Sequence, residues 1–64
     1  MDIMWIEHLA SWRTDVGFFT CEIWEASGAY HWAVYRNTGE YVHAGEGRTI
    51  EIAKRDALFA AGHR

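Results

Sequence analysis

The sequence predicts an α+β fold with the element order α-β-β-β-α and a three-stranded antiparallel sheet. Three observations predict it: an amphipathic stretch over residues 2–13, three alternating stretches between short turns, and an alanine-striped stretch near the C-terminal end. The chain has 64 residues, which is the size of one small domain. We therefore expect a single domain over residues 1–64.

Residues 2–13 segregate apolar and polar side chains as an amphipathic helix does. On a helical wheel, one broad face collects the apolar residues Trp5, Ile6, Leu9, Ala10 and Trp12. Asp2 is placed to cap this helix, and residues 14–17 are expected to form the turn that follows it. A strand is the alternative, because residues 3–6 would also suit a buried strand.

The middle of the chain is rich in aromatic and β-branched residues, which favour strands. The predicted strands cover residues 18–25, 30–36 and 40–44. Residues 27–29 turn the chain after the first strand, and residues 37–39 form a tight connection after the second. Gly39 is expected to take positive φ in that connection.

Residues 45–62 are expected to form a loop followed by a helix. Thr49 can accept a hydrogen bond from the first turn, and Glu51 complements the positive end of the helix dipole. Gly62 is suited to end the helix. Small apolar residues recur at near-helical spacing, namely Ile50, Ala53, Ala57 and Ala61. Such a stripe lets the helix lie close to the sheet.

The charge and the cysteine content limit the classes of function. The formal charge is −3, from six Lys and Arg against nine Asp and Glu. This balance opposes nonspecific binding to nucleic acid, which depends on clustered cations. Cys21 is the single cysteine, so no intrachain disulfide can form and a reducing compartment is expected. We expect a cytoplasmic protein without membrane contact, because the sequence shows neither a signal-peptide pattern nor the ~18-residue apolar run of a membrane span.

No group of residues predicts catalysis. The histidines His8, His31, His43 and His63 fall on different predicted elements, without the i, i+4 spacing of paired metal ligands. Cys21 lies mid-strand on an apolar side, where a thiol usually acts as a small hydrophobic group. A phosphate-binding Gly-x-x-x-x-Gly-Lys loop is absent from the sequence. We therefore expect no enzyme activity, no cofactor and no metal.

Two motifs resemble a known family. Gly28-Ala29-Tyr30-His31, followed by Tyr35, is similar to a Gly-Pro-x-His turn with an aromatic residue four positions past the histidine. Gly45-Glu46-Gly47-Arg48-Thr49, continued by Ala53, Lys54 and Ala57, is similar to a Gly-x-Gly-x-Ser-Lys-Lys-x-Ala-Lys helix entry. Both motifs belong to the double-stranded-RNA-binding domain, and the likeness spans most of the chain. The resemblance implies that both helices cover one sheet face and that RNA is recognised by its shape.

The chain departs from this family at the RNA contacts. Ile50 and Glu51 occupy the positions of two family lysines, and Ala29 replaces the proline of the turn. These changes remove cations and add an anion where the family contacts phosphates, so RNA binding should weaken strongly. The resemblance leaves weak, shape-dependent binding of duplex RNA as the alternative function. Its candidate residues are His31, Arg48, Lys54 and Arg55.

Aromatic residues on the second predicted strand suggest an interface. Both sides of this strand are largely apolar, although only one face of the sheet is expected to be covered. If the register of the family holds, Tyr35 is buried and Trp32 and Val34 lie outside. Exposed aromatic clusters usually mark binding surfaces. The candidate protein-binding residues are Trp24, Tyr30, Trp32, Val34 and Tyr41. The alternative is that the first segment or the chain ends fold over this face and enlarge the core.

The sequence thus predicts a non-catalytic protein-interaction module. Its bare sheet face would bind a protein partner or a second copy of the chain. The acidic, compact chain would also suit an inhibitor that covers a basic surface of its partner, as small phage-encoded anti-defence proteins do.

Overall fold

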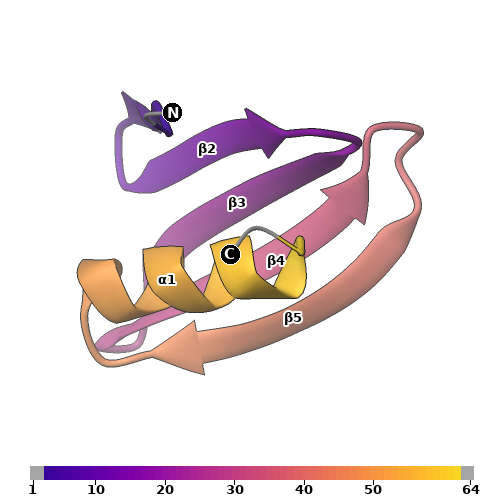
Figure 1. The fold of residues 1–64 in the computed structure, drawn as a ribbon. Coiled ribbons are helices and arrows are strands. Elements are labelled where there is room, and N and C mark those ends of the chain that lie inside the picture. The colour runs from indigo at the N-terminus through magenta and orange to yellow at the C-terminus, as the bar shows by residue number, and fades with distance from the viewer. Residues whose placement is uncertain (1–2, 63–64) are drawn as a thin grey trace.

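The structure is one antiparallel sheet with a helix packed on one of its faces (Figure 1). It is a computed structural model that describes residues 3–62. In chain order the elements are β1 (Ile6–His8), β2 (Ser11–Val16), β3 (Phe19–Ala26), β4 (Ala29–Arg36), β5 (Tyr41–Gly47) and α1 (Ile50–Ala60). Each strand pairs with the next along the chain, so the order in the five-stranded sheet is β1-β2-β3-β4-β5. No helix within residues 3–62 is long and apolar enough to cross a membrane.

The predicted α-β-β-β-α order and three-stranded sheet are wrong, although the α+β class is right. The described part of residues 2–13 forms β1 and the start of β2 instead of a helix. Leu9 has φ 56 in the turn between these strands, which pair Glu7 with Trp12. Trp5, which precedes β1, and Trp12 of β2 both pack against the core on the helix side of the sheet. Their spacing therefore also matched a helical wheel.

The predicted turn over residues 14–17 is also misplaced. Residues 14–16 continue β2, and the chain reverses at Gly17 and Phe18, where Gly17 has φ 60. Asp2, the predicted helix cap, lies outside the described residues.

The remaining predicted elements are confirmed with small shifts of their ends, as β3, β4, β5 and α1. Gly39 has φ 97, as its turn requires. The helix α1 begins where Thr49 predicts it, because the Thr49 hydroxyl accepts a hydrogen bond from the Ile52 backbone N–H at 3.1 Å. Gly62 follows the helix with φ 82. These elements were predictable because their start and stop signals are local.

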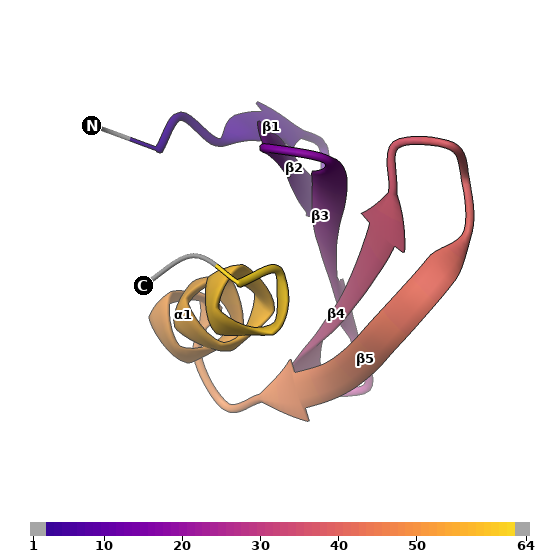
Figure 2. The ribbon, with the colours of Figure 1, turned by 45° about the vertical axis from the view of Figure 1, so that its right-hand side comes forward.

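The core lies between α1 and the inner side of β3 and β4. Its buried residues are Cys21, Ile23, Trp32, Val34, Ala53, Ala57 and Ala61. The alanines of α1 bring the helix close to the sheet, and the Cys21 thiol reaches the Ala57 carbonyl oxygen at 3.7 Å. Figure 2 shows the sheet curving around α1, which leaves the outer side of the curve facing away from the helix.

Trp32 fits into this core because β5 has a glycine beside it. Trp32 pairs with Gly45 across the two strands. A Cβ atom at Gly45 would lie 2.6 Å from the Trp32 ring, which is closer than carbon atoms can approach. The Trp32 indole N–H is buried and has no hydrogen-bond partner among residues 3–62. Ring volume, and not a polar contact, therefore holds Trp32 in place.

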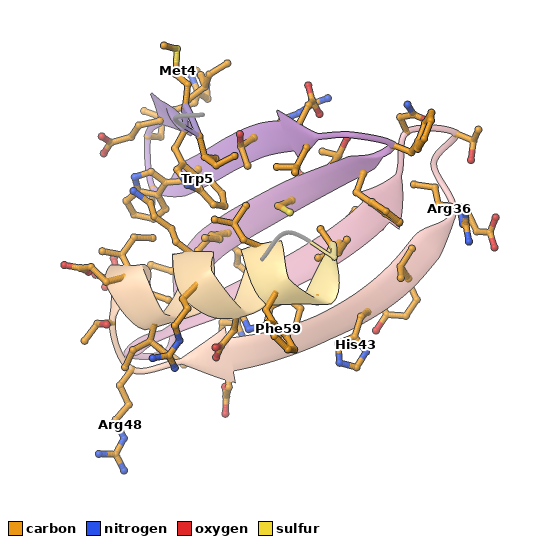
Figure 3. The ribbon with its side chains drawn as sticks, viewed as in Figure 1. Met4, Trp5, Arg36, His43, Arg48 and Phe59 are labelled. Atoms are coloured by element: carbon orange, nitrogen blue, oxygen red, sulfur yellow. The ribbon has the colours of Figure 1, made fainter. Side chains whose placement is uncertain are left out.

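The segment before β1 closes one side of the core. The Thr14 hydroxyl donates a hydrogen bond to the Met4 carbonyl oxygen at 2.7 Å. The Lys54 ammonium nitrogen of α1 lies 5.5 Å from the centre of the Trp5 ring, which is within the range of a cation–π contact. Figure 3 shows Trp5 pointing from this segment toward α1. Trp5 thus packs on the helix side of the sheet.

Candidate functional site

The candidate site is the sheet face that points away from α1, which we call the open face. Cys21 and Ile23 point into the core, so Thr20, Glu22 and Trp24 must point to the opposite side. The registers between strands extend this face across the sheet. Its members on β2 to β5 include Arg13, Asp15, Thr20, Glu22, Trp24, His31, Ala33, Tyr35, Tyr41, Ala44 and Glu46.

At one end of the open face, Trp24 lies flat against His31. The two residues are partners across β3 and β4, with ring centres 5.8 Å apart and ring planes 21° apart. His31 Nε2 lies 3.2 Å from the Ala26 carbonyl oxygen, so Nε2 carries the proton and donates. His31 Nδ1 lies 3.7 Å from a carboxylate oxygen of Glu46, which forms an ion pair when the imidazole is protonated. These contacts hold the imidazole, and the imidazole in turn supports a Trp24 side chain that is 41% exposed.

At the other end, Tyr35 and Tyr41 form a second aromatic pair. Their ring centres are 6.1 Å apart and their planes meet at 67°, an edge-to-face arrangement. Val34 pairs with His43 whereas Tyr35 pairs with Tyr41, so β5 carries an irregularity at this point. Such a bulge re-aims side chains. Here it brings Tyr41, which is 61% exposed, onto the open face beside Tyr35.

Between the two aromatic pairs, the open face has small side chains with carboxylates beside them. Ala33 is 3% exposed and pairs with Glu22 on one side and Ala44 on the other. The exposed Glu22 and Glu46 carboxylates therefore flank a floor of small side chains.

On β2, the open face holds a charged pair. The Arg13 guanidinium lies 3.8 Å from the Asp15 carboxylate. Asp15 also accepts a hydrogen bond of 2.7 Å from the Thr20 hydroxyl. Carboxylates thus outnumber the guanidinium on this face. A shallow hollow of about 270 Å³ lies beside the pair and is lined by Arg13, Thr20, Glu22, Tyr35, Arg36, Asn37 and Gly39.

The predicted protein-binding residues divide between the two faces. Trp24 and Tyr41 are exposed on the open face. The expectation that Trp32 and Val34 lie outside is wrong, because they are 6% and 0% exposed in the core. Tyr30 is half-buried and packs against Trp12, with ring centres 5.9 Å apart.

The physical reason for this error is the pairing between β3 and β4. Trp32 pairs with Ile23 and Val34 pairs with Cys21, so both point into the same core as their partners. Tyr35, which the family register placed inside, lies on the open face opposite Thr20.

The residues predicted for RNA binding do not form one surface. His31 lies on the open face, whereas Lys54 and Arg55 belong to α1 on the other side of the sheet. Lys54 contacts Trp5, and the Arg55 guanidinium lies 3.3 Å from the Asp56 carboxylate. Arg48 extends away from the fold in the loop before α1 (Figure 3). The sheet separates His31 from the helix cations.

Cys21 is a poor nucleophile in this structure. Burial raises the pKa of its thiol from 9.0 to about 11, and the Asp15 carboxylate acts in the same direction. The thiol is therefore protonated at neutral pH, whereas thiol catalysis needs the thiolate. Within residues 3–62, no three His, Cys, Asp or Glu side chains converge as metal ligands would. His63 lies outside the described residues.

The sequence reasoning missed Glu22, Glu46 and Tyr35 as members of the exposed face. The signal was present in β3, where the apolar Cys21 and Ile23 alternate with the polar Thr20 and Glu22. That alternation identifies the inner side of β3. The short turn fixes which residues of β3 and β4 pair, so it also places Tyr35 on the outer side.

Comparisons with protein-family models, curated proteins and solved structures find no match to this chain. The resemblance to the double-stranded-RNA-binding domain stays a prediction, although the arrangement of two helices that it implied is not the one found. The function must therefore be argued from the open face.

Proposed function

We propose that this chain is a non-catalytic protein-interaction module that binds a basic segment of a partner protein through the open face. One observation carries the proposal. Trp24 and Tyr41 are exposed on the same sheet face as the carboxylates of Glu22 and Glu46, while α1 covers the other face. This observation supports binding at the open face, and the carboxylates predict that the partner segment is basic.

The chemistry of these residues suits arginine and lysine side chains. A guanidinium or ammonium group binds favourably over an aromatic ring when it lies within about 6 Å of the ring centre. A neighbouring carboxylate adds a charge-assisted hydrogen bond, and arginine can make two such bonds at once. Trp and Tyr are also the residues that most often dominate protein interfaces. Trp24 and the Glu46 carboxylate flank His31 on the open face, so they offer an aromatic ring and an anion to the cationic side chains of a basic segment.

The net charge of the whole chain favours the same partner. A chain of charge −3 attracts a basic surface at long range, and this attraction raises the association rate at low salt. The module inhibits its partner when the covered basic surface is one that the partner needs. The analogy with small phage-encoded anti-defence proteins rests on size and charge alone. The unpaired Cys21 suits the cytoplasm as the place of action.

The test uses an oligo-arginine peptide as the probe for a basic segment. We expect this peptide to shift the NMR signals of the Trp24 indole and of β3 to β5 residues on the open face. An oligo-glutamate peptide of equal length should not shift them, and added salt should weaken the effect. Trp24→Ala should reduce the affinity at least ~tenfold, the effect of a hot-spot residue. Phe18→Ala, which removes an exposed ring from a turn, is the matched control and should leave it unchanged.

Equal affinity of the peptide for the Trp24→Ala and Phe18→Ala variants would overturn the proposal. Duplex RNA at low salt is the second probe. If RNA binds more tightly than the peptide and shifts the signals of Arg48 and Lys54, the alternative function replaces this one.

A further inference from the structure

The strand β5 forms a long edge of the sheet. It runs over Tyr41–Gly47, and among the described strands it has a neighbour on one side only. The opposite edge is β1, which covers only three residues, Ile6–His8. An edge strand presents unpaired backbone N–H and C=O groups that can pair with another chain. The length of β5 makes it the stronger candidate for such pairing.

The turn between β3 and β4 identifies which β5 residues present these groups. Ser27 and Gly28 have φ 54 and 78, and the strands close on the pair Ala26 and Ala29. In this two-residue turn the closing pair is hydrogen-bonded, and hydrogen-bonded pairs then alternate along the ladder. By this alternation, Trp32 and Ile23 form a pair that is not hydrogen-bonded. The backbone N–H and C=O of Trp32 therefore point toward β5.

On β5, this alternation determines which residues direct their backbone N–H and C=O groups to the free edge. Gly45 is the partner of Trp32, so its backbone groups point toward β4. Its neighbours Ala44 and Glu46 then direct their backbone groups to the free edge, because successive residues point to opposite sides. Ala44 lies at the centre of the strand, with three residues of β5 on each side of it.

The sequence of β5 lacks most features that protect an edge. Natural edge strands usually carry lysine, proline or several charges that block pairing. The residues of β5 include no lysine and no proline, and Glu46 is their single formally charged side chain. The bulge lies at the Tyr41 end and leaves the other residues in regular register.

We infer that two copies of this chain pair through β5, antiparallel and centred on Ala44, so that their sheets become continuous. In this register Ala44 faces Ala44 of the second copy, and Glu46 faces Val42. Like charges directly opposite one another would destabilise a strand pair, and this register avoids them. His43 faces Gly45, where the Trp32 ring already occupies the space of a side chain. The strand is thus complementary to itself in charge.

Exposed apolar side chains also lie on β5 and on the helix beside it. Val42 and Tyr41 are exposed on β5, and Phe59 is a large exposed side chain on α1. Figure 3 shows Phe59 and His43 on the β5 side of the helix. Interfaces within homodimers are more apolar than other protein surfaces. The dimer joins two open faces side by side, so it would present two copies of the proposed binding surface.

Sedimentation velocity with a charge-swap pair tests this inference. Ala44→Lys and Ala44→Asp each place identical charges opposite one another at the centre of the interface. We expect the wild-type chain to sediment as a dimer and each variant alone to show at least a ~tenfold higher dissociation constant. Mixing the two variants should restore the dimer, because lysine then faces aspartate. His8→Lys on β1 is the control and should dimerise like the wild type.

A wild-type monomer at the highest soluble concentration would overturn the inference, as would failure of the mixture to restore a dimer. Ala44→Cys gives a measurement that does not depend on the charged variants folding. The central pairing brings these two Cα atoms to about 5.5 Å, a distance that a disulfide spans, whereas Glu22→Cys should not cross-link. These experiments use no peptide, so their failure is distinct from failure of the proposed binding function.

Discussion

The two faces of the sheet use tryptophan in opposite ways. Trp32 and Trp24 lie on neighbouring strands, yet Trp32 is 6% exposed under α1 and Trp24 is 41% exposed on the open face. Trp32 faces a glycine and packs among small side chains. Trp24 lies against the imidazole of His31 near a carboxylate. The residue type is the same. The residues opposite each ring on the neighbouring strands decide whether the ring supports the fold or is available for the proposed binding.

We therefore expect stability and the proposed binding to be separable in this small chain. The helix side concentrates apolar burial, which is the main source of folding free energy. Among the described residues, the core cluster contains no side chain of the open face. Substitutions on the helix side should therefore change the free energy of unfolding, and substitutions on the open face should change binding with the fold intact.

Removing the Trp32 ring should have the largest effect. Trp32→Ala leaves a cavity beside Gly45, and such substitutions cost about 3–5 kcal/mol. A chain of 64 residues has little stability to spare, so we expect much of this variant to be unfolded at 25 °C. Trp32→Phe should cost less, because it keeps most of the ring and removes a buried N–H without a partner among the described residues.

Urea unfolding followed by circular dichroism measures both Trp32 variants, with Trp24→Ala as the matched control. If Trp24→Ala were as destabilising as Trp32→Ala, the distinction between the two faces would be lost.

High pH should lower the free energy of unfolding through ionisation of Cys21 on the helix side. The folded pKa of about 11 exceeds the ordinary 9.0, so the thiol stabilises the fold fully below pH 9. Between pH 9 and 11 the unfolded chain ionises first, and this stabilisation is lost as the pH rises. The shift corresponds to at most about 3 kcal/mol.

The measurement for Cys21 is the urea midpoint of the wild type and of Cys21→Ala at several pH values. The midpoint of the wild type should fall more steeply above pH 9 than that of the variant. Parallel curves would show that other groups cause the whole pH dependence.

A single methyl group at Gly45 should have an intermediate effect. Gly45→Ala places a Cβ atom 2.6 Å from the Trp32 ring, and overpacking of this kind typically costs ~1–3 kcal/mol. Thermal melting compares this variant with Glu46→Ala, a substitution on the same strand that points to the open face. Equal melting temperatures would contradict the close packing between β5 and Trp32.

The smallest effect on stability, and the sharpest test of the open face, is expected for His31→Ala. Cross-strand pairs contribute only about 0.2–1 kcal/mol, so the fold should remain intact. The Trp24 ring loses its support and should become more exposed, which fluorescence quenching by acrylamide would detect. His43→Ala is the control, because His43 lies beside Trp32 on the helix side. Equal quenching in the two variants would mean that His31 does not position Trp24.

The parts of the fold that the sequence predicted correctly carry their own local signals. The Thr49 hydroxyl marks the start of α1, and the glycines of the turns separate β3, β4 and β5. The N-terminal hairpin was missed because Leu9 takes positive φ without being glycine, asparagine or aspartate. Its apolar residues also share the spacing of a helix.

The face of Trp32 was mispredicted for a different reason. Alternation divides a strand into two sides, but it does not say which side a distant helix will cover. The pairing of Ile23 with Trp32 settles that question, and it follows from the position of the turn at Ser27 and Gly28. The pair of Tyr35 and Tyr41 on the open face could not be predicted, because the bulge that brings Tyr41 beside Tyr35 leaves no clear mark in the sequence.

The fit between Gly45 and Trp32 has a consequence for how this chain can change over time. A larger residue at position 45 requires a smaller side chain at position 32. A double substitution, such as Gly45→Ala together with Trp32→Leu, should recover part of what the first change loses. Among descendants of this chain, the two positions should therefore co-vary, and a shared swap at both would trace common ancestry even where the outer surface has diverged.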